Sequence, residues 1–207
     1  MKYNDMTFGQ MEAVINKLGG MDGVQRLLSG ELVVTEPTPP QAASLELRQW
    51  TVWRTLKLGT GIKTAADFRK ALKTADCNIG DWGNNILGQP AFTVADKEIE
   101  VELVIASGAD LGFKGSATRA DIYKRAQELG LDRCPAEVGP QLRLQYTDQP
   151  NGEWLLIAME PIADSGGDLS VFNVRRNDDG TRWLIGDGGG PDFVWNAGLR
   201  WVFLRRK

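Results

Sequence analysis

Two aspartates flank a glycine-rich stretch near the C-terminus, and their oxygens could bind a divalent cation. The stretch reads DGGGPD over residues 187–192. Glycines let the backbone approach a ligand closely, and carboxylates are ligands that Mg²⁺ and Ca²⁺ prefer. The ligand spacing of a calcium loop and the Gly-Lys-Ser/Thr end of a phosphate loop are absent. Asp187 and Asp192, with Glu137 as a third acid, are therefore candidates for carboxylate-dependent catalysis, and a hairpin loop without a ligand is the alternative.

The 207 residues include no histidine, which removes most familiar catalytic arrangements. Histidine is the side chain whose unperturbed pKa lies near neutrality. Without it the chain has no Ser-His or Cys-His pair and no imidazole ligand for zinc. An enzyme built on this chain would rely on carboxylates, as in a metal-assisted hydrolase or transferase. The sequence contains no motif for an organic cofactor, and we expect none.

The two cysteines, Cys77 and Cys134, are too few for a disulfide framework and do not form a CxxC pair. Cys134 follows a predicted helix that ends near Gly130, and the partial negative charge of a helix C-terminus raises a thiol pKa. Arg133 could supply the positive charge that a nucleophilic thiol needs, but there is no histidine to act as its base. We interpret both cysteines as free thiols and Cys134 as a packed structural residue.

The C-terminal strands mix arginine with aromatic residues, as do surfaces that bind single-stranded nucleic acid. The candidates for stacking on bases and pairing with phosphates are Arg182, Trp183, Arg200 and Trp201. The alternative is a core strand over residues 199–206 with arginines at its solvated ends. Acidic residues are interspersed and the net charge is -3, which argues against nucleic acid as a partner.

Two strand-then-helix patterns must position these residues. Alternating apolar residues predict strands at 50–58 and 98–105, and each is followed by a Thr-x-Ala-Asp helix start, at Thr64 and Thr118. An internal duplication would explain the match, and so would the similar needs of any helix N-terminus. Both explanations stay open at this point.

The C-terminal third is predicted to be a run of short strands. Turns rich in glycine and aspartate separate strands at residues 142–146, 153–162, 169–176, 181–185 and 199–206. Connections this short favour antiparallel hairpins over crossover helices. Residues 78–97 are less regular and predict a loop with one helical turn.

The N-terminal end is organised differently. Residues 1–36 predict a helical segment of two short helices, residues 37–44 a proline-rich linker, and residues 45–207 the α+β domain. A helical pair this small cannot bury enough apolar surface to offset its own conformational entropy. Its apolar face must therefore dock on the main body or on a protein partner.

The first ten residues lack a basic region followed by an apolar one, so no secretory signal is predicted. No run of residues approaches the roughly 20 apolar residues that a membrane helix needs. We expect a cytoplasmic protein without membrane contact.

Three stretches resemble a group of small uncharacterised bacterial proteins. They are residues 7–31, residues 64–82 and residues 118–159, the last with its CPAEVGP segment at 134–140. The resemblance implies no activity, substrate or catalytic residue, so a functional prediction must rest on the residues themselves.

The elements predict an α+β protein with an N-terminal helical segment, two βα units and a C-terminal antiparallel meander that curls into a partial barrel. Without histidine or a cluster of catalytic residue types, the chain offers surfaces for binding more than groups for chemistry. We therefore expect a non-catalytic binding or protein-interaction protein. A carboxylate- or metal-dependent hydrolase or transferase and a single-stranded nucleic-acid binder are the alternatives.

The interpretation of the cysteines gives a first prediction. Cys77 and Cys134 should react with a thiol reagent only after unfolding, because a buried thiol is inaccessible and its pKa is not lowered. The measurement is the labelling rate at neutral pH with and without denaturant. Rapid labelling of Cys134 in the native protein would contradict its structural role.

Overall fold

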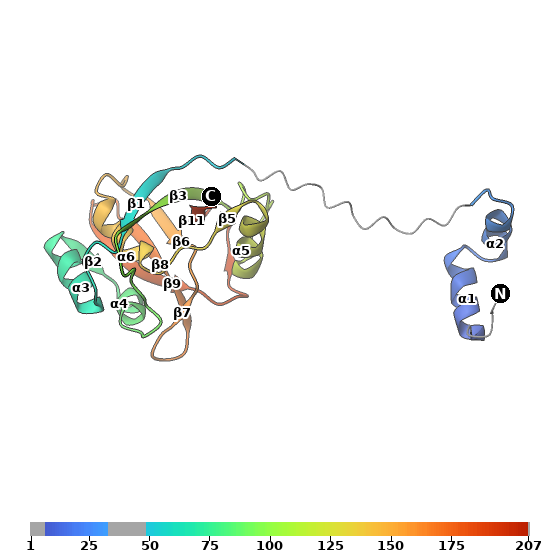
Figure 1. Cartoon of the computed structure of the whole chain (residues 1–207), viewed down its shortest axis with the longest axis horizontal. Helices are drawn as coiled ribbons and strands as arrows, with labels where there is room; N and C mark the ends of the chain where they lie inside the picture. The colour runs from blue at the N-terminus through green and yellow to red at the C-terminus, as the bar shows by residue number, and fades with distance from the viewer. Residues whose placement is uncertain (1–6, 33–48, 207) are drawn as a thin grey trace. The chain divides into compact units, whose positions relative to one another are not determined.

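The computed structural model describes residues 7–32 and 49–206, drawn in Figure 1 as helices and strands. The chain divides into two compact units, Met1–Ser44 and Leu45–Lys207. The proline-rich linker predicted at residues 37–44 lies outside the described residues. The first unit contains helices, and the second contains the sheet and the remaining helices.

Two helices make up the described part of the first unit, α1 (Phe8–Lys17) and α2 (Met21–Leu28). A capping box opens α1: the Thr7 hydroxyl accepts from the Gln10 amide at 3.3 Å, and the Gln10 side chain accepts from the Thr7 amide at 2.9 Å. α1 has no buried residue, and α2 buries only Gly23. The helical pair thus lacks an apolar core of its own, as its size requires.

A nine-stranded sheet forms the centre of the described part of the second unit. Its main path runs through β1 (Arg54–Leu58), β3 (Ile99–Ser107), β11 (Arg200–Arg205), β6 (Trp154–Ile157), β8 (Leu169–Arg176), β9 (Arg182–Gly188) and β2 (Cys77–Ile79). The short strands β5 (Leu131–Asp132) and β7 (Ile162–Ala163) pair with β11 and β8, and β4 (Ala117–Thr118) pairs with β10 (Val194–Trp195). The predicted α+β class is confirmed, and the C-terminal sheet curls into a half-barrel (Figure 1).

Four helices pack on this sheet. They are α3 (Ala65–Thr74), α4 (Asp81–Leu87), α5 (Arg119–Glu128) and α6 (Val138–Gln145). The predicted helix starts at Thr64 and Thr118 are confirmed, because each hydroxyl accepts from the amide three residues on at 3.1 Å. Within residues 7–32 and 49–206, no helix has the length and apolar content needed to span a bilayer.

The C-terminal strands are not a simple antiparallel meander. β6, β8 and β9 follow one another as antiparallel neighbours, but β11 returns between β3 and β6 and runs parallel to β6. The reason is visible in its sequence, since Trp201, Val202 and Phe203 are consecutive and all at most 1% exposed. A strand that is apolar on both faces belongs in the middle of a sheet.

The strand predicted at residues 142–146 is wrong, because these residues belong to α6 or follow it directly. The alternation of Leu142 and Leu144 with polar residues suggested a strand. Pro140 lies in the first turn of the helix, where its missing N–H costs no hydrogen bond. Residues 138–143 are all buried, so the helix lies within the core and shows no polar face to reveal its period.

The helices cover both faces of the sheet. Trp201, Leu156 and Asn173 are cross-strand partners and share one face, on which Tyr123 of α5 packs against Trp201 with ring centroids 5.6 Å apart. Phe172 points to the opposite face, where a side chain at Gly139 of α6 would overlap its ring. In Figure 1, α5 lies on one side of the sheet and α3, α4 and α6 lie on the other.

A buried carboxylate secures the N-terminal end of α6. Glu137 is 1% exposed, and its two oxygens accept from the backbone amides of Gly59 and Ala95, each at 2.8 Å. Gln141 donates a further bond at 2.9 Å. Gly59 has a φ of +66°, and a Cβ there would lie 2.1 Å from a carbonyl oxygen, so only glycine fits this approach. Glu137 therefore joins the loop after β1 to the loop before β3.

A buried guanidinium secures the other end of α6. Arg143 is fully buried and donates to the Gln149 side chain at 2.5 Å, to the Tyr146 carbonyl at 2.7 Å and to the Arg175 carbonyl at 3.1 Å. Burial lowers the pKa of Arg143 to about 10, which leaves it charged at neutral pH. Neutral acceptors therefore surround this charge in place of a carboxylate.

Glu137→Ala should strongly destabilise the domain. The substitution leaves the amides of Gly59 and Ala95 without acceptors inside the protein, which should lower the free energy of unfolding by about 3 kcal/mol. Urea denaturation measures this change. Glu98→Ala is the matched control, since Glu98 forms an exposed pair with Lys57 at 3.0 Å, and its loss should cost less than about 1 kcal/mol. Equal effects of the two substitutions would contradict the role assigned to Glu137.

Candidate functional site: an acidic aromatic pocket

A cavity of about 420 Å³ lies where α4, the β7–β8 hairpin and the end of β9 meet. It is lined by three carboxylic acids and by apolar side chains, with no lysine or arginine: Trp82, Asp164, Asp168, Leu169, Ser170, Asp187, Gly188, Gly190 and Phe193. Of the predicted site residues, only Asp187 lines it. We call this cavity the acidic aromatic pocket.

Two glycines on β9 explain why aromatic rings line this pocket. A Cβ at Gly186 would lie 2.9 Å from the Cβ of Trp82, and a Cβ at Gly188 would lie 2.4 Å from the ring of Phe193. A larger residue at Gly186 would push α4 at Trp82 away from the strand, and one at Gly188 would push away the Phe193 ring. The rings keep large exposed areas, 61% for Trp82 and 48% for Phe193. Exposed aromatic rings that flank a cavity are typical of a binding site.

Hydrogen bonds fix the hairpin that supplies the acids. Asp164 accepts from the amides of Gly166 at 2.8 Å and Asp168 at 3.0 Å, which closes the turn. Asn85 of α4 exchanges two bonds with Ser165, at 2.8 and 3.1 Å. The hairpin and the helix that carries Trp82 are thus held together before any ligand is present.

The charged form of Asp187 is disfavoured in the folded state because the side chain is partly buried. Burial raises its pKa, while a 2.9 Å bond from the Asn173 amide and the charge of Arg175 act in the opposite direction. Asn173 is 1% exposed, and its carbonyl oxygen has no partner within the described part of the chain. A buried amide with an unpartnered oxygen beside a half-buried carboxylate is costly, so its presence near a cavity points to a use.

The other two candidate acids do not join Asp187. Asp192 is exposed and precedes Phe193 without lining the pocket, and Glu137 lies at the start of α6 with both oxygens bonded to the backbone. Across the residues that the structure describes, no group of three or more Cys, Asp or Glu side chains could hold a metal ion. The carboxylate-dependent chemistry expected from the sequence thus has no assembled site among these residues.

The four nucleic-acid candidates lie on strands that β6 and β8 separate. On β9, Arg182 donates to the Ala75 carbonyl and Trp183 to the Thr181 hydroxyl at 3.1 Å. On β11, Arg200 pairs with Glu153 at 2.8 Å and Trp201 is fully buried. Trp201 has no exposed face on which a base could stack, because it belongs to the core that α5 covers.

The cysteines are free and buried, as predicted. The Cys134 thiol donates to the Val202 carbonyl at 3.4 Å, and burial raises its pKa. Both features agree with a packed structural residue.

Sequence reasoning missed the aromatic residues of the pocket. Trp82 lies in a segment predicted to be largely loop, and Phe193 follows a turn in which only the carboxylates drew attention. The Gly-x-Gly pattern at 186–188 was predicted to belong to the turn after a strand at 181–185, whereas β9 continues to Gly188. Glycines in a strand mark a close approach by another group, and this signal was available only if the strand was extended that far.

No protein-family model, no curated protein and no solved structure matches the chain.

Asp187→Asn should stabilise the protein at neutral pH. A raised pKa means that the folded state favours the protonated acid, so the contribution of this group is complete below the unfolded pKa of about 3.9 and is lost as the pH rises through the folded pKa. The neutral amide avoids that loss. Urea denaturation at pH 7 should show a higher free energy of unfolding for the variant, and the difference should shrink towards pH 3.5.

Asp179→Asn is the control, because the pKa of Asp179 is shifted in the opposite direction to that of Asp187. Hydrogen bonds from Thr181 lower the pKa of the exposed Asp179, so this substitution should bring no gain at pH 7. An Asp187→Asn protein less stable than the native one at pH 7 would contradict the prediction.

Proposed function

We propose that this protein is a non-catalytic binding protein whose acidic aromatic pocket accepts an arginine side chain of a protein partner. The observation that carries the proposal is the composition of the cavity. Three carboxylic acids and two exposed aromatic rings line it, and no lysine or arginine is part of the lining.

The chemistry of the lining fits a guanidinium group. A cation over the face of Trp or Phe is attracted by the ring quadrupole, and guanidinium stacks on such rings more readily than ammonium does. Carboxylates at the rim then form charge-assisted hydrogen bonds with the donors of the fork. Trp82, Phe193 and Asp168 supply these contacts. The volume of about 420 Å³ suits one long side chain better than a large cofactor.

The two alternatives have less support. A metal-dependent hydrolase or transferase needs a cluster of ligands, which the described residues lack. A single-stranded nucleic-acid binder needs exposed rings beside free cations, whereas Asp164, Asp168 and Asp187 line the same pocket as the Trp82 and Phe193 rings and would repel phosphates. The expectation that the N-terminal helical segment binds a protein partner stays a prediction.

A titration with a small arginine derivative tests the proposal. ¹⁵N-labelled protein is titrated with N-acetylarginine amide and, separately, with N-acetylcitrulline amide, which has nearly the same shape without the charge. We expect amide shifts in residues 80–88, 163–170 and 186–193 with the arginine compound only. Trp82→Ala and Asp168→Asn should each weaken binding about fivefold, because each removes one cation contact.

The controls are residues of the same types away from the pocket. Trp154 is 41% exposed and lies under Arg175, and Asp178 lies in the exposed turn before β9, so Trp154→Ala and Asp178→Asn should leave the affinity unchanged. Equal binding of the arginine and citrulline compounds, or equal losses in all four variants, would refute the proposal.

A further inference from the structure

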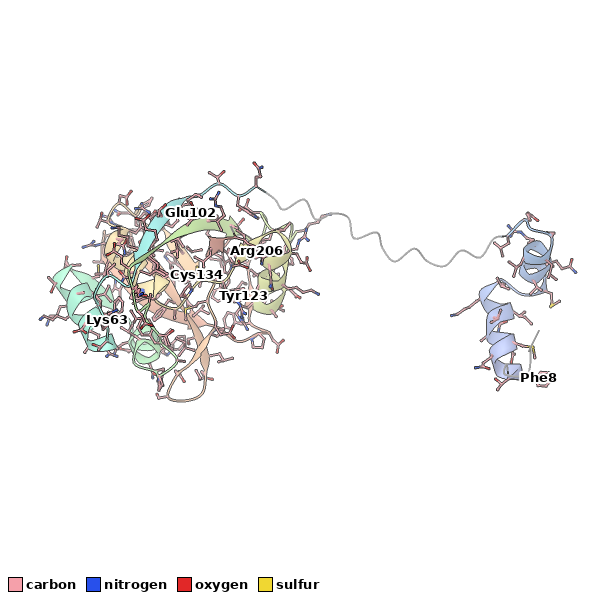
Figure 2. The ribbon with its side chains drawn as sticks, in the orientation of Figure 1. Phe8, Lys63, Glu102, Tyr123, Cys134 and Arg206 are labelled. Carbon is pink, nitrogen blue, oxygen red and sulfur yellow. The ribbon has the colours of Figure 1, made fainter. Side chains whose placement is uncertain are left out.

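A second and larger cavity, of about 580 Å³, lies between α5 and the end of the sheet formed by β5 and β11. The charged side chains that line it are mainly positive, whereas those that line the acidic aromatic pocket are negative. Three basic side chains surround it, Arg119, Lys124 and Arg133, and Tyr123 and Phe203 form part of its wall. Figure 2 labels Tyr123, on α5, and Arg206, which pairs with the cavity residue Asp132. We call it the basic cavity.

The charges of the basic cavity do not cancel. Its one acid, Asp132, is neutralised by Arg206, which also lowers the pKa of Asp132. Arg133 pairs with Glu160. Arg119 and Lys124 have no carboxylate within ion-pair distance among residues 7–32 and 49–206. Two uncompensated cations therefore face this cavity in a chain whose net charge is -3.

Arg119 is held in place before any ligand binds. Its Nε donates to the Gly190 carbonyl at 3.2 Å, and its guanidinium carbon lies 4.8 Å from the centre of the Tyr123 ring. That ring is fixed in turn, because the Tyr123 hydroxyl donates to the Met159 carbonyl at 3.1 Å and the ring packs edge-on against Trp201. The Arg119 guanidinium is thus held on a rigid support beside the cavity, and a guanidinium with a fixed orientation is well suited to binding oxygens.

Lys124 and Arg133 add exposed positive charges to this arrangement. Lys124 is one turn beyond Ala120 on the cavity side of α5 and is exposed, and Arg133 follows β5 and is exposed. A fixed guanidinium on α5 with two further cations, of which Arg133 also pairs with Glu160, can contact a ligand that carries more than one negative charge. Tyr123 and Phe203 are at most 8% exposed, so the cavity offers little apolar surface to a lipid chain.

We propose that the basic cavity binds a small, multiply charged oxyanion between Arg119, Lys124 and Arg133. Phosphate and carboxylate groups share this chemistry. The site does not depend on the proposed arginine-binding function, since the two cavities select ligands of opposite charge.

Titration with pyrophosphate tests the proposal. ¹⁵N-labelled full-length protein is titrated at constant ionic strength, with sodium chloride as the blank. We expect saturable shifts in the amides of residues 119–127 and 131–133, and a rise of Tm through binding to the folded state. Lys124→Gln should weaken binding about tenfold, whereas Lys124→Arg should retain it. Lys70→Gln, which removes an exposed lysine from α3, should leave the affinity unchanged.

A parallel titration with citrate distinguishes the two sources of the oxyanion. Similar affinities for both probes would support a general polyanion site, and binding of pyrophosphate or of citrate alone would assign it to phosphate or carboxylate ligands. Two results would overturn the proposal: neither probe shifts these amides beyond the sodium chloride blank, or Lys124→Gln binds as tightly as the native protein. Neither result bears on the arginine titration, so the two hypotheses fail separately.

Discussion

The burial of two opposite charges at the ends of α6 is the constraint on which the rest of the domain depends. A carboxylate at the start of a helix and a guanidinium near its end both agree with the helix dipole. Neither charge is paired with the other. Glu137 is satisfied by backbone amides and Arg143 mainly by carbonyl oxygens, so each charge positions main chain from distant parts of the sequence. The Arg143 Nε has no partner among the described residues, so the bonds of its two terminal nitrogens offset the loss of solvation. The loops that supply these partners have little freedom to move.

This arrangement determines where binding surfaces can form. α6 packs on one face of the half-barrel, and Glu137 at its start binds the loops after β1 and before β3. On the other face, Tyr123 of α5 packs against the sheet. Side chains fill the space between the sheet and these helices, and the two cavities described above lie at the margins of the sheet. One lies beyond the end of β9, where Gly186 and Gly188 admit aromatic rings, and the other lies beside α5 and the end of β11. A rigid core with sites at its edges is how many folds carry binding residues.

Local features of the fold could be predicted from the sequence, and features that depend on distant partners could not. Threonine with aspartate three residues on predicts a helix start because the capping bonds are local, and both such starts are correct. Residues 142–146 were predicted as a strand because a helix buried on all sides loses the period that identifies it. The place of β11 in the sheet depends on β3 and β6, far away in sequence. The same holds for the candidate site: Asp187 could be selected from its loop, but Trp82 and Asp168 reach it only through the fold.

The absence of histidine agrees with the residue types that line the two cavities. The acidic aromatic pocket is lined by aspartates and the basic cavity by arginine and lysine, groups whose ordinary pKa values lie well away from neutrality. Asp187 differs from the ordinary case, because its burial beside Asn173 raises its pKa. A catalyst that moves protons at neutral pH needs groups that change charge there, whereas a surface that binds charged ligands is best served by groups that do not. The composition of the chain and the chemistry of its cavities thus agree with the proposed role in binding charged ligands.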